Sequence, residues 1–119
     1  MTDDRIYLQH LLDAIARIEA YVAVGREVFL ATPHWQDAVI RQLEIIGEAT
    51  KRLSAEVRAR HPGIAWRRIA GMRDQLIHNY MGVDLQLVWE VTQQNLPELK
   101  AHVQAILCEL ESEADSTDV

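Results

Sequence analysis

Apolar residues return every three or four positions along almost the whole chain, and this period constrains the fold more than any other feature. One face of an α-helix repeats at that interval, whereas one face of a β-strand repeats at every second residue. At the N-terminus the period runs through Leu8, Leu11, Ile15, Ile18 and Val22. It predicts a helix over residues 3–24, which Gly25 ends or bends.

A second helix is predicted over residues 33–60. Thr32 is a good N-cap, and Pro33 suits the first helical position because the N–H that it lacks would have no partner inside the helix. The apolar period continues through Val39, Leu43, Ile46, Thr50, Leu53 and Val57. The pair Pro62-Gly63 stops this helix.

A third helix is predicted over residues 64–81, with Ile69, Met72 and Leu76 on its apolar face. Gly82 suits the residue that follows its C-terminus. Asp84 can cap a fourth helix, and Pro97 either kinks that helix or begins a fifth. The apolar period then continues to about residue 110.

The sequence shows neither a sustained period of two nor an Asn-Gly or Asp-Gly hairpin signal. We therefore expect an all-α fold, most simply an up-and-down bundle of four to five helices. Residues 1–110 are expected to form one helical domain. Residues 111–119 are acidic and small, and we expect them to form a disordered tail.

Composition and charge narrow the function classes. No apolar stretch approaches the ~20 residues that cross a bilayer, and the N-terminus is unlike a signal peptide. Cys108 is the only cysteine, so no internal disulfide can form. We therefore expect a cytoplasmic protein without membrane contact. The net charge of −6 argues against indiscriminate binding to nucleic acid. Residues 41–73 nevertheless carry a local charge of +5, while the rest of the chain carries −11.

The five histidines do not have the spacing of a metal site, because no His-x-x-x-His or Glu-x-x-His pair occurs. We expect no metal and no other cofactor. Gly47 is expected to permit close helix packing. The three tryptophans are expected to anchor the core, and Cys108 to be inert packing in the last helix.

The segment from Arg73 to Tyr80 combines an arginine, a histidine and a tyrosine near the end of the third predicted helix. On a wheel centred on Ile69, Arg73 falls inside the apolar stripe, whereas Asp74 and His78 fall on the outward side. A charge on a core-facing stripe is costly unless it is paired or used. Arg73 therefore either pairs with a buried carboxylate for structural reasons or serves a ligand. The best candidate partners for Arg73 are Glu44 and Glu48.

This segment resembles the signature of the HEPN superfamily, and specifically of the HepT toxin family: an arginine, four residues, a histidine, one residue and a tyrosine. Arg73, His78 and Tyr80 match it. The flanks match too, in Ile45-Ile46-Gly47-Glu48-Ala49, Trp66-Arg67-Arg68-Ile69-Ala70-Gly71-Met72 and Val88-Trp89. The resemblance covers the chain except its acidic tail.

The resemblance implies a HEPN-like helical fold and a metal-independent endoribonuclease, the toxin of a toxin–antitoxin pair. Arg73 and His78 would be catalytic, and Asp74 and Asn79 would be supporting polar residues. The partner would be an MntA-like nucleotidyltransferase antitoxin, which can transfer AMP onto the motif tyrosine, here Tyr80.

One chain supplies a single motif histidine, and five residues on an ideal helix separate Arg73 from His78 by about 140° and ~7.5 Å of rise. A two-fold homodimer would bring two copies of the same patch together, so that two histidines could share the acid and base roles. Candidates for RNA binding are the basic residues Lys51, Arg52, Arg67 and Arg68. The alternative is a non-catalytic helical subunit that binds nucleotide or substrate beside a nucleotidyltransferase.

Overall fold

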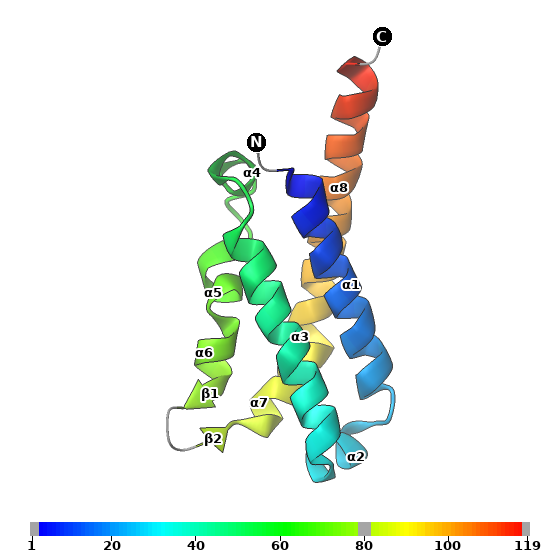
Figure 1. Cartoon of the computed structure of the whole chain (residues 1–119), viewed down its shortest axis with the longest axis vertical. Coiled ribbons are helices and arrows are strands. Elements are labelled where there is room, and N and C mark those ends of the chain that lie inside the picture. The colour runs from blue at the N-terminus through cyan, green and yellow to red at the C-terminus, as the bar shows by residue number, and fades with distance from the viewer. Residues whose placement is uncertain (1–2, 79–81, 118–119) are drawn as a thin grey trace.

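Two long helices, α1 (Asp4–Val22) and α3 (Pro33–Lys51), pack along one another and form the most extensive helix–helix contact of the bundle (Figure 1). The computed structural model describes residues 3–78 and 82–117. Asp3 begins α1, because its carboxylate accepts the backbone N–H of Arg5 at 3.0 Å. The apolar positions predicted for both helices are buried, among them Leu8, Leu11, Ile15, Ile18, Val39, Leu43 and Ile46.

A tight turn and a short helix connect these two helices. Gly25 has a φ of +96°, a conformation that favours glycine, and α2 (Arg26–Ala31) follows it directly. Phe29 of α2 is fully buried and its ring lies 5.5 Å from the ring of Trp89. Thr32 and Pro33 then start α3 as the sequence predicts.

The predicted helix over residues 33–60 is two helices in the structure. α3 ends at Lys51, and α4 (Ala55–Arg60) begins after a short turn. Ser54 explains the break, because its hydroxyl accepts the N–H of Val57 at 3.1 Å and donates to Asp4 at 2.7 Å. The apolar period survives the break, since Val57 is still buried.

The predicted helix over residues 64–81 is wrong as a continuous element. The chain forms α5 (Trp66–Ala70), α6 (Met72–Leu76), β1 (Ile77–His78) and β2 (Gly82–Val83). The two strands pair antiparallel, with Ile77 opposite Val83. Gly82 does not cap a helix but has a φ of +86° inside β2, which suits a chain reversal.

Three elements complete the chain: α7 (Leu85–Glu90), the π-helix η1 (Val91–Asn95) and α8 (Leu96–Thr117). Asp84 caps α7 as predicted, accepting the N–H of Leu87 at 3.1 Å. Pro97 has no N–H to donate, and the wider π turn lies just before it, with the N–H of Leu96 bonded to the carbonyl of Val91. α8 continues to Thr117, beyond the helix end expected near residue 110.

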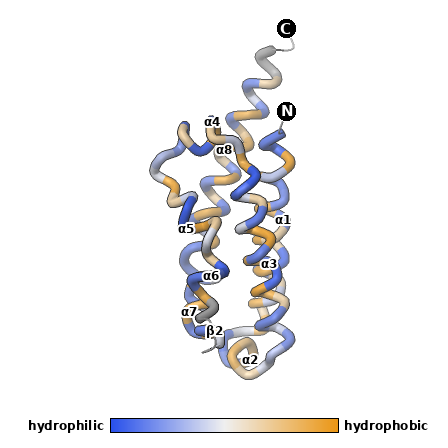
Figure 2. Tube along the Cα trace, turned by 60° about the vertical axis from the view of Figure 1, so that its left-hand side comes forward, coloured by the Kyte–Doolittle hydropathy of each residue, from blue (hydrophilic) through white to orange (hydrophobic). Residues whose placement is uncertain are grey.

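The fold is therefore all-α, as predicted, apart from the short β1–β2 ladder. The bundle is elongated, with extents of 55 × 27 × 23 Å. Hydrophilic and hydrophobic residues alternate along its helices in Figure 2, which is the amphipathic pattern of a bundle with one core. None of the helices in residues 3–78 and 82–117 combines the length and apolar character of a bilayer crossing.

Two side-chain expectations have different outcomes. Trp66 is buried, and its indole N–H donates to the carbonyl of His61 at 3.0 Å, so it anchors the core as expected. Trp35 and Trp89 are half-buried and pack against the core. Cys108 is exposed on α8, so the expectation that it packs inside is wrong. Its neighbours Ile106 and Leu107 fill the core positions of that turn.

Candidate functional site

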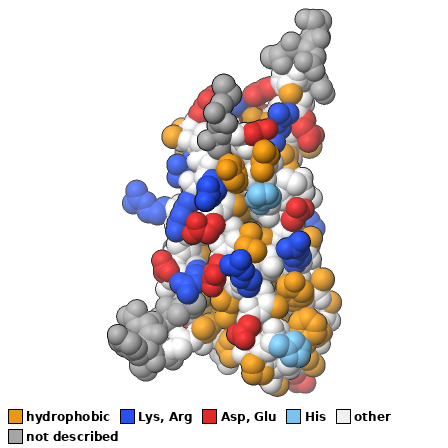
Figure 3. All heavy atoms as spheres, in the orientation of Figure 1, with side chains coloured by type: hydrophobic (Ala, Val, Ile, Leu, Met, Phe, Trp, Pro, Cys, Tyr) orange, Lys and Arg blue, Asp and Glu red, His pale blue; other side chains and the backbone are white. Residues whose placement is uncertain are grey.

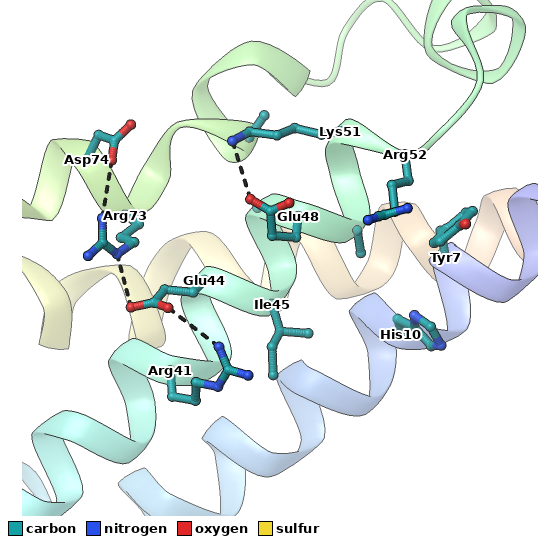
Figure 4. Close-up of a pocket in the computed structure, with 13 residues that line it drawn as sticks. Tyr7, His10, Arg41, Glu44, Ile45, Glu48, Lys51, Arg52, Arg73 and Asp74 are labelled. Atoms are coloured by element: carbon teal, nitrogen blue, oxygen red, sulfur yellow. Dashed lines mark hydrogen bonds and ion pairs between the residues drawn. The ribbon is translucent and has the colours of Figure 1, made fainter.

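A groove of about 640 Å³ lies between α1, α3 and the α5–α6 segment. Its lining is strongly charged: Arg41, Glu44, Glu48, Lys51, Arg52, Arg73 and Asp74 all border it (Figure 4). Lys, Arg, Asp and Glu side chains are intermixed over the face of the molecule that carries α3 and α6 (Figure 3). The groove therefore suits a polar ligand rather than an apolar one.

A close contact between backbones holds the walls of the groove together. A Cβ atom added to Gly47 on α3 would lie 2.9 Å from the carbonyl oxygen of Ala70 at the end of α5. Only glycine allows this approach. The prediction that Gly47 permits close packing is confirmed, and the contact fixes the distance between α3 and the segment that carries Arg73.

Arg73 is not in the core, which corrects its placement on the apolar stripe. Its side chain is 50% exposed, and Met72 and Leu76 are the buried residues of α6. The predicted stripe of Ile69, Met72 and Leu76 is buried, but the buried face is too narrow to include Arg73. Arg73 lies at the edge of the stripe and points into the groove (Figure 4).

Glu44 holds the guanidinium of Arg73. The Nε of Arg73 donates to Oε1 of Glu44 at 2.9 Å, and its Nη1 lies 3.6 Å from a carboxylate oxygen of Asp74. The second carboxylate oxygen of Glu44 lies 3.6 Å from Nη1 of Arg41. Of the two predicted partners, Glu44 is confirmed, whereas Glu48 pairs with Lys51 at 3.5 Å.

The geometry of this ion pair leaves part of the guanidinium available. Glu44 contacts Arg73 through Nε, and the Asp74 carboxylate lies 3.6 Å from Nη1, beyond hydrogen-bond distance, so the Nη donors can still bind a ligand. An arginine whose orientation is fixed in this way can bind two oxygens of a phosphate through parallel N–H donors.

The rest of the motif lies at the edge of what the structure describes. The backbone of His78 belongs to β1, opposite Gly82, and not to a helix as predicted. The relation of 140° between Arg73 and His78 therefore does not apply, because the helix ends at Leu76. The side chain of His78 and the whole of Asn79 and Tyr80 lie outside the described residues.

The four basic residues proposed for RNA binding separate into two groups. Lys51 and Arg52 join Arg73 in the groove. Arg67 and Arg68 lie on α5 and do not line it, and Arg68 borders a second, smaller pocket between α5 and α8. The positive segment of the sequence is thus spread over several surfaces.

Sequence reasoning missed three residues of the groove: Tyr7, His10 and Arg41. Tyr7 and His10 lie three residues apart on α1, and such a pair always shares a helix face. That spacing was the available signal, but only the packing of α1 against α3 places them near Arg52 (Figure 4).

No group of three or more His, Cys, Asp and Glu side chains within the described residues could hold a metal ion.

Comparisons with known proteins agree with one another. A family model described as Ribonuclease HepT-like matches residues 11–106. A protein of Methanocaldococcus jannaschii, named as a gamma-glutamylcyclotransferase and provisional RNase, is 46% identical over 110 residues, which cover 92% of this chain and 50% of that protein. The chain thus spans half the length of that relative.

Two shorter relatives align over most of their length. A provisionally named RNase of Caldanaerobacter subterraneus is 43% identical over 90% of this chain and 96% of its own. A provisionally named ribonuclease HepT of Thermococcus cleftensis is 44% identical over 79% of this chain and 86% of its own. No solved structure matches the chain significantly.

Proposed function

The chain belongs to the HepT-like ribonuclease family, and we propose that it is a metal-independent endoribonuclease that acts as the toxin of a toxin–antitoxin pair. The proposal rests on Arg73, which the ion pair with Glu44 holds half exposed in a charged groove, five residues before the motif histidine. A phosphodiester is the substrate group that such an arginine fits best.

Cleavage of RNA without a metal uses the neighbouring 2′-hydroxyl as the nucleophile. The reaction needs a base for that hydroxyl, an acid for the leaving 5′-oxygen, and positive charge on the phosphorane-like transition state. In our proposal Arg73 supplies the positive charge. His78 supplies proton transfer, since an imidazole titrates near neutral pH.

One His78 cannot act as acid and base in the same step, so we propose a homodimer with the motif segment at or near the two-fold interface. An isologous interface brings the same patch of both protomers together. Two histidines and two arginines would then surround one scissile phosphate. Asp74, whose carboxylate lies 3.6 Å from Nη1 of Arg73, and Asn79 would be the supporting polar residues.

The antitoxin in this proposal is an MntA-like nucleotidyltransferase that transfers AMP onto Tyr80, two residues after His78. The added phosphate would place negative charge and bulk where the substrate phosphate must bind, and both effects would block cleavage.

The test of the nuclease is His78→Ala, compared with His102→Ala, which removes an exposed histidine on α8. We expect His78→Ala to lose about 10²–10⁴-fold in RNA cleavage and to stop causing growth arrest, while His102→Ala behaves as wild type. If His78→Ala still arrests growth and wild type cuts no RNA, the chain is instead a non-catalytic subunit that binds nucleotide or substrate beside the nucleotidyltransferase.

The test of the modification is Tyr80→Phe, compared with Tyr21→Phe on α1. Antitoxin and labelled ATP should mark wild type and Tyr21→Phe but not Tyr80→Phe, which should remain toxic in the presence of the antitoxin. Label that persists on Tyr80→Phe would exclude this residue as the AMP acceptor.

A further inference from the structure

The end of the groove away from Arg73 has its own chemistry. Tyr7 and His10 of α1 line this end together with Arg52, which follows the last residue of α3 (Figure 4). None of these three side chains takes part in the ion pairs around Arg73. The proposed chemistry of cleavage leaves them without a role.

Arg52 differs from the other cations of the groove. Arg41 and Arg73 contact Glu44, and Lys51 contacts Glu48. Among the described residues, no carboxylate lies within 4.0 Å of the Arg52 guanidinium, and its side chain is exposed. Its donors are therefore available to an anion without first breaking an ion pair.

Tyr7 and His10 form an aromatic pair beside this free cation. Their ring centroids are 5.9 Å apart and the rings are nearly perpendicular, at 87°. In an edge-to-face contact one ring contributes only its edge, so the contact itself does not cover the faces of that ring. Tyr7 is half-buried, which limits its movement, while His10 is exposed. A flat group can therefore stack on this pair.

We propose that Tyr7, His10 and Arg52 form a subsite for one nucleotide of a single-stranded RNA, with the base stacked on the Tyr7–His10 pair and its phosphate on Arg52. The subsite deepens the proposed nuclease function, and it holds a nucleotide other than the one that is cut. From Arg41 to Lys51 the groove follows α3 for ten residues, or about 15 Å, which exceeds the reach of one phosphate group.

The chemistry favours a single strand over other ligands. Stacking on an aromatic ring requires an unpaired base, and every base has a face to stack. Ile45 and Ala49 also line the groove, but the unpaired guanidinium of Arg52 beside the ring pair favours a ligand with a negative charge over an apolar protein side chain. A free adenine nucleotide has the same base and phosphate chemistry, so the experiment separates it from a strand.

The experiment measures binding of the full chain to a fluorescent single-stranded RNA whose 2′-hydroxyls are methylated. This RNA cannot be cut, because its nucleophile is blocked, so binding is read independently of cleavage. Tyr7→Leu, His10→Ala and Arg52→Gln are compared with Tyr7→Phe, His102→Ala and Arg26→Gln, respectively. Arg26 lies on α2, at the other end of the bundle from the start of α1 (Figure 1). Thermal unfolding establishes that each variant is folded.

We expect Tyr7→Leu to weaken binding about tenfold, and Tyr7→Phe to bind as wild type because the ring remains. His10→Ala is expected to weaken binding by a smaller factor. Arg52→Gln should make the dependence of log affinity on log salt concentration less steep by about 0.7, whereas Arg26→Gln leaves the slope unchanged.

Unchanged affinity and salt slope in folded Tyr7→Leu, His10→Ala and Arg52→Gln would overturn the subsite, and cleavage by those variants would leave the nuclease function intact. Conversely, loss of binding in a protein that cuts no RNA would support the subsite and refute the nuclease. Binding of AMP that depends on Arg52, without such binding of RNA, would assign the site to a free nucleotide and refute the strand.

Discussion

At the scale of single residues, the carboxylate of Glu44 makes the contacts that orient Arg73, because it lies between two arginines. It lies 2.9 Å from Nε of Arg73 and 3.6 Å from Nη1 of Arg41. The Glu44 side chain is only 31% exposed, so water screens this contact less than it screens an ion pair on the open surface. We propose that Glu44 is a positioning residue, which acts on the reaction through the orientation of Arg73.

Glu44→Gln is expected to lower kcat about tenfold, because a neutral amide holds the guanidinium less firmly than a carboxylate does. The same change removes one negative charge from the groove, so KM should fall or stay constant. Steady-state cleavage of a fluorogenic RNA gives both constants.

Glu48→Gln is the matched control for this prediction. Glu48 lies one turn further along α3 and contacts Lys51 instead of Arg73. It should share the effect on KM, since it removes the same charge from the same groove, but should leave kcat unchanged. An equal loss of kcat in both variants would show that Glu44 does not orient Arg73.

At the scale of elements, helix ends and helix contacts place the groove. Ser54 and Gly71 break helices that the apolar period alone would continue. The contact of Gly47 with the carbonyl of Ala70 then brings the α5–α6 segment against α3. Each helix end and each close contact involves only a few residues, yet together they decide which side chains face one another in the groove.

Gly47→Ala is expected to destabilise the protein, by about 1 kcal/mol net. Alanine improves the intrinsic helix propensity of α3 by up to ~1 kcal/mol, but overpacking against a backbone carbonyl costs about 1–3 kcal/mol. Thermal and urea unfolding measure the difference.

Gly63→Ala provides the comparison, because no atom outside its own neighbours lies within 4 Å of the Cβ position and its φ is not positive. We expect its stability to stay within about 0.5 kcal/mol of wild type. If Gly47→Ala is at least as stable as Gly63→Ala, the backbone near Ala70 can move away from the added methyl group without loss of stability.

A second link between elements responds to pH. Arg60 of α4 contacts Glu113 at 2.5 Å and Glu109 at 2.7 Å on α8. The hydrogen bond from Arg60 holds the pKa of Glu113 below its ordinary value of 4.5. A carboxyl with a lowered pKa in the folded state stabilises the fold above its ordinary pKa, and this contribution is lost as the pH falls through the lowered value.

Glu113→Gln should therefore reduce the loss of stability between about pH 7 and pH 3 relative to wild type. The effect is expected to be small, because both side chains are exposed to water. Glu111→Gln on the same helix should keep the wild-type pH dependence. Identical pH profiles for wild type and Glu113→Gln, measured by urea unfolding, would contradict the role of this ion pair.

At the scale of the whole molecule, the proposed chemistry needs two chains. One protomer brings Arg73, in the groove, and a single motif histidine, His78. The elongated bundle leaves α6 on its surface beside the β1–β2 ladder, where a second protomer could cover it (Figure 1). A complete pair of proton-transfer groups would then form only in the assembly.

A heterodimer of wild type and His78→Ala tests this model. Two affinity tags allow the mixed dimer to be purified away from both homodimers. If both histidines serve one site, the heterodimer should lose about 10²-fold or more of the cleavage rate. Retention of about half the wild-type rate would mean that each protomer works alone, and sedimentation of the active enzyme as a monomer would refute the homodimer itself.

The sequence by itself determined the helical class and the buried positions. Leu8, Leu43 and Val103 lie in the core, because a period of 3.6 residues reports burial whether or not a helix is continuous. It also determined the family, through Arg73, His78 and Tyr80, and narrowed the partner of Arg73 to Glu44 or Glu48. These features depend on the spacing of residues along the chain, or on the need of a charged side chain for an oppositely charged partner.

Only the tertiary structure decided how Arg73 is presented and which residues share its groove. The apolar period carries no information about where a helix breaks, so it placed His78 on a helix, and it gives no width for the buried face, so it placed Arg73 in the core. Tyr7 and Arg52 are 45 positions apart in the sequence, and they line one groove because α1 packs along α3. Such a meeting is set by the packing of whole helices, which no local pattern encodes.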